Sequence, residues 1–484
     1  MPLLIYNSQT RRKEEFATLE PGVVRMYVCG VTVYDDAHIG HARCYVAFDA
    51  IHRHLLARGY QVRYARNFTD VDDKIIKRAR ETGLIWQQLA QHYIDSFTQD
   101  MASLGVLPPG LEPKATEHIP EIVAMVQALV DKGNAYVVDG DVYFSVRGFA
   151  RYGFLSGRNL DDMLAGARVE VDPRKECPLD FALWKSSKPG EPSWQSPWGP
   201  GRPGWHIECS AMSQKYLGNT FDIHGGGKDL LFPHHENEAA QSEAFTGQPF
   251  AHYWMHNGFV QINHEKMSKS LGNFFTIKDI LKTVQPESLR LFFLSKHYRS
   301  PLDFSEDALK DAAQSLGRLY TALMAAQAAT VAPAGQAIES PSGLAWLQEV
   351  KAQVEAFERG MDDDFNTAAA TGALFGLARV SNRLASELET PERQALLALC
   401  AVRLKFLGGR LGILQGDPQK FMQGQASPQG SGPDPAWVEK RIAARQAARK
   451  AKDFALADRI RDEIKVAGVL LDDTPQGTRW RVES

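Results

Sequence analysis

The hydrophobic pattern changes period several times in the first part of the chain. Residues 23–28 form a run of β-branched and aromatic side chains that predicts a buried strand, and a glycine follows it. Apolar residues then recur at helical spacing over 42–58, which predicts a helix. A second strand is expected over 62–68, after which Asp70 or Asp72 is placed to cap a second helix. This alternation predicts a parallel sheet of the α/β class.

The rest of the chain divides into an irregular stretch and a long helical part. Two further helices are predicted over 86–104 and 119–131. The pattern becomes irregular over 136–203, where residues 136–146 alternate and many glycines, prolines and tryptophans follow, so we expect an insertion there. Helical periodicity returns after residue 305 and predicts a helical bundle. Residues 415–436, rich in Gln, Gly, Ser and Pro, predict a flexible linker.

Composition is typical of a soluble globular protein. The chain has 484 residues, enough for several domains, and 44% of them are hydrophobic. Charged residues follow only a few apolar ones at the start, so we expect no leader segment, and no apolar run is long enough to span a bilayer. The five cysteines are odd in number and scattered, which favours free thiols or metal ligands in a cytosolic protein. The net charge of −3 means that any RNA binding must use local basic surfaces.

The segment 27–41 is the first candidate for chemistry. It contains His-Ile-Gly-His, and His38, Gly40 and His41 lie where the first strand gives way to the first helix. The unpaired N–H groups and the dipole of a helix start attract phosphate, and the imidazoles add donors. A glycine leaves room for a flat base to lie on the backbone. Taken alone, the two histidines are equally consistent with surface residues on a first helical turn.

A second segment, 266–270, reads Lys-Met-Ser-Lys-Ser. It predicts a mobile loop whose Lys266 and Lys269 can reach a polyphosphate, although a solvated charged loop is the simpler explanation of this segment alone. Together and in this order, the two motifs resemble the paired signatures of class I aminoacyl-tRNA synthetases. The resemblance implies a Rossmann-like domain that activates an amino acid with ATP and Mg²⁺. The two histidines and the two lysines would then stabilise the phosphate charge.

Four residues far apart in the sequence are candidates for a metal site. His234 and Glu238 are four residues apart after Pro233, which suits a helix start, so both would lie on one helical face. Cys29 and Cys209 would reach that face if the two halves of the fold meet at a Rossmann crevice. Spacing alone favours small buried cysteines and a charged helix face at least as much, because structural zinc sites usually have closely spaced cysteines. The nearest rival ligands are His224 and His235. The remaining cysteines are expected to be packing residues: Cys44, Cys177 and Cys400.

The whole chain resembles the cysteinyl-tRNA synthetases. The matching segments are 67–74, 180–185, 204–212 and 222–238. In that family the matching positions bind one zinc ion per subunit: Cys29, Cys209, His234 and Glu238. The resemblance also implies an ATP site that includes Gly40, Gly226 and Asp229 beside the signature residues. The amino acid would contact Gly30, Thr69 and Trp205.

Zinc suits the selection that such an enzyme must make. Cysteine differs from serine at a single atom, and an apolar pocket distinguishes one methylene only by about 10- to 200-fold. Zinc is thiophilic and lowers the pKa of a bound thiol, so the substrate would ligate as thiolate and serine would be rejected. The expected reaction is ATP-dependent activation of L-cysteine to cysteinyl-adenylate with release of pyrophosphate. Transfer to the 3′-terminal ribose of cysteine tRNA follows.

The last part of the chain carries a candidate RNA-binding surface. Residues 437–465 hold nine basic against five acidic side chains, a local charge of +4. Such a face is commonly only solvated, but beside Trp437 and Trp480 it could bind phosphate and stack unpaired bases. Residues 469–480 predict a small hairpin, and by resemblance this end recognises the anticodon. The candidate tRNA contacts are Trp437, Arg441 and Arg445.

The predicted organisation is an α/β catalytic domain with an insertion, then a helical bundle and a small mixed α/β C-terminal domain. The predicted parts are 1–135 and 204–260 (the two halves of the Rossmann-like domain), 136–203 (connective-peptide-like insertion), 261–303 (KMSKS loop and stem-contact region), 304–414 (bundle), 415–436 (linker) and 437–484 (anticodon-binding module). The family's habit is a monomer without membrane association. Two other functions stay open: a mycothiol-pathway ligase that joins cysteine to an amino sugar, and a non-catalytic zinc-containing RNA-binding relative. The C-terminal module argues against the first, and the intact signatures argue against the second.

Overall fold

The computed structural model of the chain forms two units. It describes residues 1–160, 163, 172–262, 265–266, 275–328, 337–387, 390–423, 433–474 and 477–482. Unit 1 comprises Met1–Val260, Tyr298–Leu302 and Asp362–Phe365. Unit 2 comprises Gln261–His297, Asp303–Met361 and Asn366–Ser484. Among the described residues, no helix combines the length and the hydropathy needed to cross a membrane.

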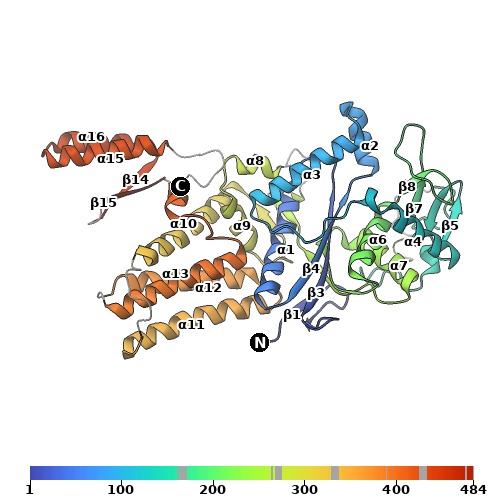
Figure 1. Cartoon of the computed structure of the whole chain (residues 1–484), viewed down its shortest axis with the longest axis horizontal. Helices are drawn as coiled ribbons and strands as arrows, with labels where there is room; N and C mark the ends of the chain where they lie inside the picture. Colours follow the sequence, from blue (N-terminus) through green and yellow to red (C-terminus); the bar gives the residue numbers. More distant parts are fainter. Residues whose placement is uncertain are drawn as a thin grey trace. The chain divides into compact units, whose positions relative to one another are not determined.

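A four-stranded parallel sheet forms the centre of unit 1. In the order in which they pair, its strands are β10 (Ala251–Asn257), β9 (Phe221–Gly227), β3 (Val23–Thr32) and β4 (Gln61–Thr69). Helix α1 (Ile39–Ala57) covers one face, and α6 (Trp205–Leu217) and α7 (Glu236–Thr246) lie on the other side (Figure 1). Strand β3 is almost entirely buried because both faces of the sheet are covered. The predicted parallel α/β sheet is therefore confirmed.

The other helices of unit 1 follow the sequence pattern closely. Among the described residues they are α2 (Asp73–Thr82), α3 (Trp86–Ser103), α4 (Ile119–Asp131) and the short turns η1 (Ala115–His118), η2 (Val146–Gly148) and η3 (Leu231–His235), the last of which carries His234. Asp72 caps α2 by accepting a hydrogen bond from the backbone of Lys74 at 2.8 Å. Gly83 ends α2 with a left-handed φ of 70°, which costs a glycine little. An antiparallel hairpin opens the chain, β1 (Leu4–Asn7) with β2 (Arg12–Glu15).

The predicted insertion has a sheet of its own. Its antiparallel strands are β5 (Ala135–Val138), β6 (Asp141–Phe144), β7 (Phe181–Ser186) and β8 (Gly201–Pro203). The expectation of an irregular stretch was thus wrong for β7 and β8, whereas β5 and β6 lie where the sequence alternates. The glycines and prolines occupy the turns, while apolar side chains such as Phe144 and Trp184 pack against α4 and α6 in one core.

Unit 2 is mainly helical, as predicted. Its helices up to residue 423 are α8 (Ile277–Leu281), α9 (Pro286–Leu294), α10 (Glu306–Ala328), α11 (Pro341–Asp362), α12 (Thr367–Ala385), α13 (Pro391–Leu411) and α14 (Pro418–Met422). Three short strands complete the element order: β11 (Val260–Ile262), β12 (Glu265–Lys266) and β13 (Leu302–Phe304). Helix α14 lies within the range predicted as a linker. Its Phe421 ring stacks on Tyr320 with centroids 4.1 Å apart, so this part of the range is ordered helix.

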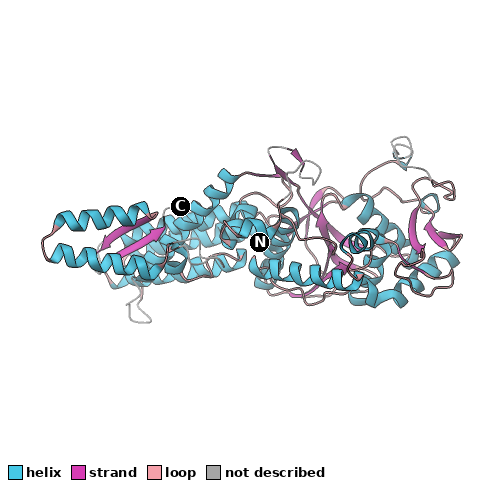
Figure 2. Cartoon of the chain, turned by 90° about the horizontal axis from the view of Figure 1, so that it is seen from above, coloured by secondary structure: helices cyan, strands magenta, loops and turns pink. Residues whose placement is uncertain are grey.

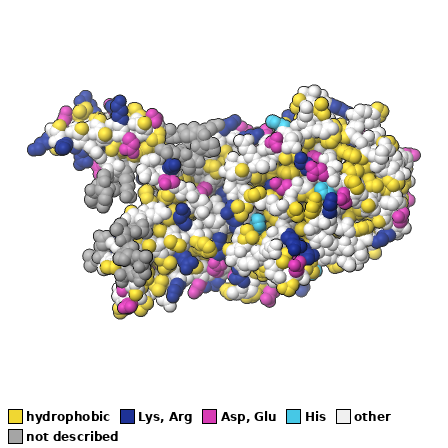
Figure 3. All heavy atoms as spheres, in the orientation of Figure 1, with side chains coloured by type: hydrophobic (Ala, Val, Ile, Leu, Met, Phe, Trp, Pro, Cys, Tyr) yellow, Lys and Arg dark blue, Asp and Glu magenta, His cyan; other side chains and the backbone are white. Residues whose placement is uncertain are grey.

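The C-terminal module pairs two helices with a hairpin. Helices α15 (Pro435–Lys450) and α16 (Phe454–Val466) lie beside strands β14 (Val469–Thr474) and β15 (Gly477–Val482) (Figure 2). The predicted hairpin is confirmed. Lys and Arg side chains gather over the helix pair (Figure 3). Trp480, however, is only 6% exposed and donates its indole N–H to Glu439 at 2.8 Å, so the suggestion that it stacks bases was wrong.

Candidate active site and metal centre

The residues singled out for substrate chemistry lie near the carboxyl ends of the central strands. Cys29 and Gly30 are close to the end of β3, Thr69 ends β4, and Gly226 is close to the end of β9. Because the strands are parallel, these ends meet at one edge of the sheet. Ligands of open α/β sheets bind in the crevice outside that edge.

Two glycines allow a close approach at this edge. A Cβ on Gly30 would lie 1.5 Å from the carbonyl oxygen of Asn67, whose side chain also accepts a hydrogen bond from the Gly30 N–H at 2.8 Å. A Cβ on Gly226 would lie 2.9 Å from the ring of His235. Asp229 follows β9 and is exposed. The first two positions therefore require glycine for packing reasons, and Asp229 faces solvent where a ligand can reach it.

His38 and His41 cap the first turn of α1. Nδ1 of His38 accepts a hydrogen bond from the N–H of Gly40 at 3.1 Å, and Nδ1 of His41 accepts from the N–H of His38 at 3.2 Å. Their rings stack with centroids 3.7 Å apart. Burial, together with the neighbouring His38, lowers the pKa of His41 well below its usual value. Since both Nδ1 atoms accept, the proton of each neutral ring is on Nε2.

The four predicted metal ligands come together and are all buried. Their ligand atoms lie within 4.8 Å of one another: Cys29, Cys209, His234 and Glu238. Nε2 of His234 is 2.8 Å from a Glu238 carboxylate oxygen and 3.7 Å from Sγ of Cys209. Sγ of Cys29 is 3.3 Å from the same Glu238 oxygen and 4.0 Å from the second sulfur. Three segments of the chain therefore converge on a compact set of sulfur, nitrogen and oxygen donors.

The charge states of this cluster suit a cation. The Cys29 thiol and His234 lower the pKa of Cys209 to about 6 against the effect of burial. Burial raises the pKa of Cys29 well above its usual range, and its hydrogen bond to Cys209 adds to this. Burial would lower the pKa of His234, but Glu238 and Cys209 outweigh it and raise the value to about 10. Near neutral pH the cluster thus holds a thiolate, a carboxylate and a protonated imidazole, and a metal ion bound there would displace the proton of His234.

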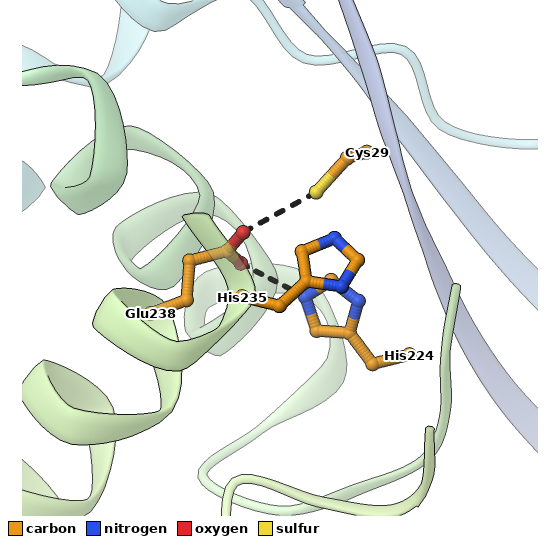
Figure 4. Close-up of side chains that lie close together, drawn as sticks. All are labelled: Cys29, His224, His235 and Glu238. Carbon is orange, nitrogen blue, oxygen red and sulfur yellow. Dashed lines mark hydrogen bonds and ion pairs between the residues drawn. The ribbon is translucent and has the colours of Figure 1, made fainter. Parts of the chain in front are cut away.

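A second set of donors shares two members with the first. Cys29, His224, His235 and Glu238 also offer ligand atoms within 4.8 Å of one another. Figure 4 shows the Glu238 carboxylate between Cys29 and His224, and Nε2 of His224 lies 2.8 Å from its second oxygen. The rivals named from the sequence are therefore adjacent to the cluster. His224 is positioned to orient Glu238 as an outer partner as readily as to bind a metal itself, whereas Nδ1 of His235 is engaged with His256.

Sequence reasoning missed two histidines of this region. Nδ1 of His206 lies 2.8 Å from Nδ1 of His234, and Nε2 of His256 lies 2.9 Å from Nδ1 of His235. His206 lies three residues before Cys209 on α6, so its helical spacing from a predicted ligand was an available signal. His256 is on β10, which only the tertiary fold brings to the cluster. Trp205 stacks on His234 with ring centroids 4.2 Å apart.

Thr69 has a buried acidic partner that was also not foreseen. Its hydroxyl donates to a carboxylate oxygen of Glu208 at 2.8 Å. Burial and the neighbouring Cys209 raise the pKa of Glu208 well above its usual value. Trp205, three residues before Glu208, is 38% exposed. The predicted substrate contacts Gly30, Thr69 and Trp205 thus border the buried cluster of metal-ligand candidates.

The other predicted site residues lie in unit 2. Lys266 ends β12, whereas Lys269 and most of the second signature loop lie outside the described residues. The guanidinium of Arg441 is 5.7 Å from the centre of the Trp437 ring. Arg445 is 7% exposed and makes two hydrogen bonds to Asp473 at 2.9 and 2.8 Å. Its charge is therefore engaged within the C-terminal module.

The remaining cysteines are buried and apart from these donor sets. Burial raises the pKa values of Cys44 and Cys400, which keeps both thiols protonated. Cys177 is 2% exposed. Within the described part of the chain, none of the three belongs to a possible metal-ligand group, in agreement with their expected packing role.

Comparisons with known proteins agree with this geometry. The family described as tRNA synthetases class I (C) catalytic domain matches residues 15–314, and the DALR domain matches residues 356–415. A Geobacter sulfurreducens protein named "Cysteine--tRNA ligase" is 54% identical over 485 residues, covering 100% of both chains. A protein of that name from Thioalkalivibrio sulfidiphilus is 55% identical over 480 residues, with 99% of each chain covered. Mycobacterium tuberculosis methionyl-tRNA synthetase in complex with methionyl-adenylate aligns with a TM-score of 0.62 at 17% identity, covering 84% of this chain and 95% of that one.

The parallel sheet, the helix start that carries His-Ile-Gly-His and the catalytic-domain match define a class I aminoacyl-tRNA synthetase. Since relatives of full length share more than half of their residues with it, the chain belongs to the cysteine-tRNA ligase family and is an enzyme of that family. The resemblance found in the sequence is thereby confirmed. The methionyl enzyme supports the fold alone, because its identity is low.

Proposed function

We propose that this enzyme activates L-cysteine with ATP to cysteinyl-adenylate and then transfers it to the 3′-terminal ribose of cysteine tRNA. The observation that supports this most is that a candidate metal ligand and a signature histidine lie on one strand and the loop that follows it. Strand β3 carries Cys29 of the buried donor cluster, and the loop after β3 leads to His38 at the start of α1. A substrate bound in that crevice would have its side chain at the cluster and its carboxylate near the phosphate-binding helix start.

The signature histidines would act as neutral hydrogen-bond donors. Because backbone N–H groups occupy both Nδ1 atoms, the ring proton of each histidine would be on Nε2, and this is the atom that would donate to a phosphate oxygen of ATP. The lowered pKa of His41 keeps this ring neutral at physiological pH. Negative charge that develops on the phosphates would be stabilised by these donors, by Lys266 and Lys269, and by Mg²⁺. Gly40, Gly226 and Asp229 would border the adenosine part of ATP.

The buried donor cluster would hold one zinc ion. The ligands would be Cys29, Cys209, His234 and Glu238, whose donor atoms are already close together and partly deprotonated. When bound, zinc would supply thiolate selection, holding the sulfur of cysteine and disfavouring the harder hydroxyl of serine. The protonated His234 balances part of the buried negative charge in the metal-free cluster, and zinc would take over this role when it displaces the proton.

The amino acid would be oriented by residues around the cluster. The Thr69 hydroxyl donates a hydrogen bond to Glu208, so its oxygen lone pairs would accept from the substrate ammonium. Trp205 and the bare backbone of Gly30 would shape the pocket. For tRNA, α15 would supply stacking from Trp437, which is half-buried against the core of the module, and positive charge from Arg441. Arg445 would act there indirectly, by holding the hairpin. A monomer in the cytosol is the expected state.

Transfer of labelled cysteine to total tRNA by the purified protein tests this function. We expect charging that needs ATP and Mg²⁺, is lost after zinc chelation and returns when zinc is restored. Labelled serine is the control and should not be transferred. Cysteine-dependent release of pyrophosphate without charging would point to a ligase with a different acceptor. No cysteine-dependent turnover would refute the proposal.

A further inference from the structure

Unit 1 includes two short segments whose neighbours in the sequence belong to unit 2. Tyr298–Leu302 follows α9, and Asp362–Phe365 joins α11 to α12. The two segments meet at Asp364, which is fully buried. The contacts described below all lie within unit 1.

The Asp364 carboxylate is completely satisfied by hydrogen-bond donors. One oxygen accepts from the backbone N–H of Tyr6 and from the hydroxyl of Tyr298, each at 2.8 Å. The other accepts from Nε of Arg299 at 2.7 Å. The backbone of Asp364 is left-handed, with φ 59°, and its N–H donates to the carbonyl of Leu4 at 2.9 Å. A buried charge with this many partners, in a backbone conformation that few residues adopt, holds the surrounding segments in one arrangement.

Tyr298 connects Asp364 to two elements of the active site. Its carbonyl oxygen accepts from the N–H of Gly258 at 2.8 Å and from Nη2 of Arg43 at 3.3 Å. Gly258 directly follows β10, and a Cβ there would lie 2.4 Å from the carbonyl of Ser300, so the two backbones are in contact. Arg43 lies on α1 two residues after His41 and is 1% exposed.

The Asp362–Phe365 segment also contacts the C-terminal end of α1. Nε2 of His54 lies 3.0 Å from a carboxylate oxygen of Asp362, and Arg58 reaches the other oxygen at 3.3 Å. Asp362 and His54 are both almost fully buried. Asp362 thus contacts α1 directly at its C-terminal end. Tyr298 contacts the helix at Arg43, close to the turn that carries the signature histidines.

We infer that Asp364 is a positioning residue for the adenylation step. Through Tyr298 and Arg43 it sets the place of the first turns of α1 relative to the end of β10, and so the place of His38 and His41. This inference rests on the proposed function, in which the two histidines contact ATP. A displacement of about 1 Å at reacting groups can lower the rate a hundredfold. A residue such as Asp364, which holds α1 in place without touching substrate, can therefore have a measurable effect on the rate.

The test replaces Asp364 by Asn. The amide has one acceptor oxygen, so at least one of the donors on the carboxylate loses its partner. We expect kcat of cysteine-dependent pyrophosphate exchange to fall about 10- to 100-fold, while KM for cysteine and the bound zinc stay at parental values. Tyr298→Phe should act in the same direction. The double variant should be no slower than Asp364→Asn, since both changes interrupt one connection.

Asp363→Asn is the matched control. Asp363 is the adjacent carboxylate, but its side chain is 46% exposed and pairs with Lys13 at the surface. Its replacement should leave exchange activity unchanged. A second readout is amide hydrogen exchange over residues 39–45 in the absence of substrates. It should become faster in Asp364→Asn and Tyr298→Phe and stay unchanged in Asp363→Asn.

A purely structural role would give a different result. Lower thermal stability with unchanged kcat and unchanged hydrogen exchange in α1 would overturn the inference, as would a rise in KM for cysteine together with loss of zinc. If Asp364→Asn does not fold, Tyr298→Phe decides, because it removes a single hydroxyl. If the parent shows no cysteine-dependent exchange, the proposed function fails, but hydrogen exchange over 39–45 still tests the positioning.

Discussion

The rings of His38 and His41 stack at the first turn of α1, with centroids 3.7 Å apart and planes inclined by 20°. Each Nδ1 accepts a hydrogen bond from a backbone N–H at the helix start, that of Gly40 or that of His38. The ring proton of each histidine is therefore on Nε2. A structural role in capping and a chemical role toward phosphate therefore use different atoms of the same rings.

The first prediction separates these two roles at His41. In His41→Asn the side-chain oxygen can still accept from the His38 N–H, but the donor at the Nε2 position is lost. We expect kcat for cysteine-dependent pyrophosphate exchange to fall about 10²- to 10³-fold, the usual cost of removing one oxyanion donor. KM for cysteine should change little. His92→Asn, an exposed histidine on α3, is the control. Near-parental kcat in His41→Asn would mean that this ring only caps the helix.

The second prediction concerns the donor cluster. Cys209→Ser replaces a thiolate ligand by a hydroxyl that does not ionise at neutral pH, so bound zinc should fall and KM for cysteine should rise steeply. The affinity for ATP should remain close to the parental value. Cys400→Ser, which alters a buried thiol of unit 2, should keep its zinc. Metal analysis by mass spectrometry beside cysteine titration checks this, and normal cysteine activation by zinc-depleted Cys209→Ser would remove the metal from the mechanism.

A third prediction compares two glycines. Gly30→Ala would bring a methyl group within 1.5 Å of the Asn67 carbonyl, so β3 and β4 must separate. We expect a loss of more than about 3 kcal/mol in the free energy of unfolding, in the range of severe overpacking. Gly317→Ala in α10 meets no atom within 4 Å and should instead stabilise by about 0.5 to 1 kcal/mol. Urea unfolding measures both, and equal midpoints would contradict the packing argument.

A fourth prediction gives the pH dependence of the C-terminal module. Hydrogen bonds from Arg445 and Thr478 hold the pKa of Asp473 well below its ordinary value of 3.8. A carboxyl whose pKa is lowered by folding stabilises the fold above its unfolded pKa, and this contribution disappears as the pH falls through the folded value. The hairpin should therefore weaken below about pH 4, by less than about 1 kcal/mol because the pair is partly exposed.

The Asp473→Asn variant should already lack this contribution at pH 7. Its module should then show a smaller further loss between pH 7 and pH 3 than the parent. The indole N–H signal of Trp480, followed by NMR during thermal unfolding, reports on the hairpin directly, because this group donates to Glu439 in the folded module. The same acid sensitivity in variant and parent would show that another group is responsible.

Local patterns of the chain were sufficient for most elements. The parallel sheet, the helix from Ile119 to Asp131, the capping of α2 by Asp72 and the final hairpin all follow from periodicity and capping residues. The individual strands and helices could be predicted because each depends on neighbours in sequence, and the parallel arrangement followed from their alternation. The signature residues were equally visible, since they form contiguous motifs. Strands β7 and β8 were not predicted because strands of three to six residues between glycines and prolines carry little periodic signal.

The donor cluster depended on the tertiary structure. Cys29, Cys209 and Glu238 come from β3, α6 and α7. Their spacing in the sequence did not make a metal site a better explanation than ordinary burial. Only the packing of those helices on the sheet brings their donor atoms within 4.8 Å and shifts their pKa values. The same holds for His206, His256 and Asp364, whose partners lie far away along the chain. Contacts between distant segments carry no periodicity, so three-dimensional packing alone decides which polar groups share a buried site.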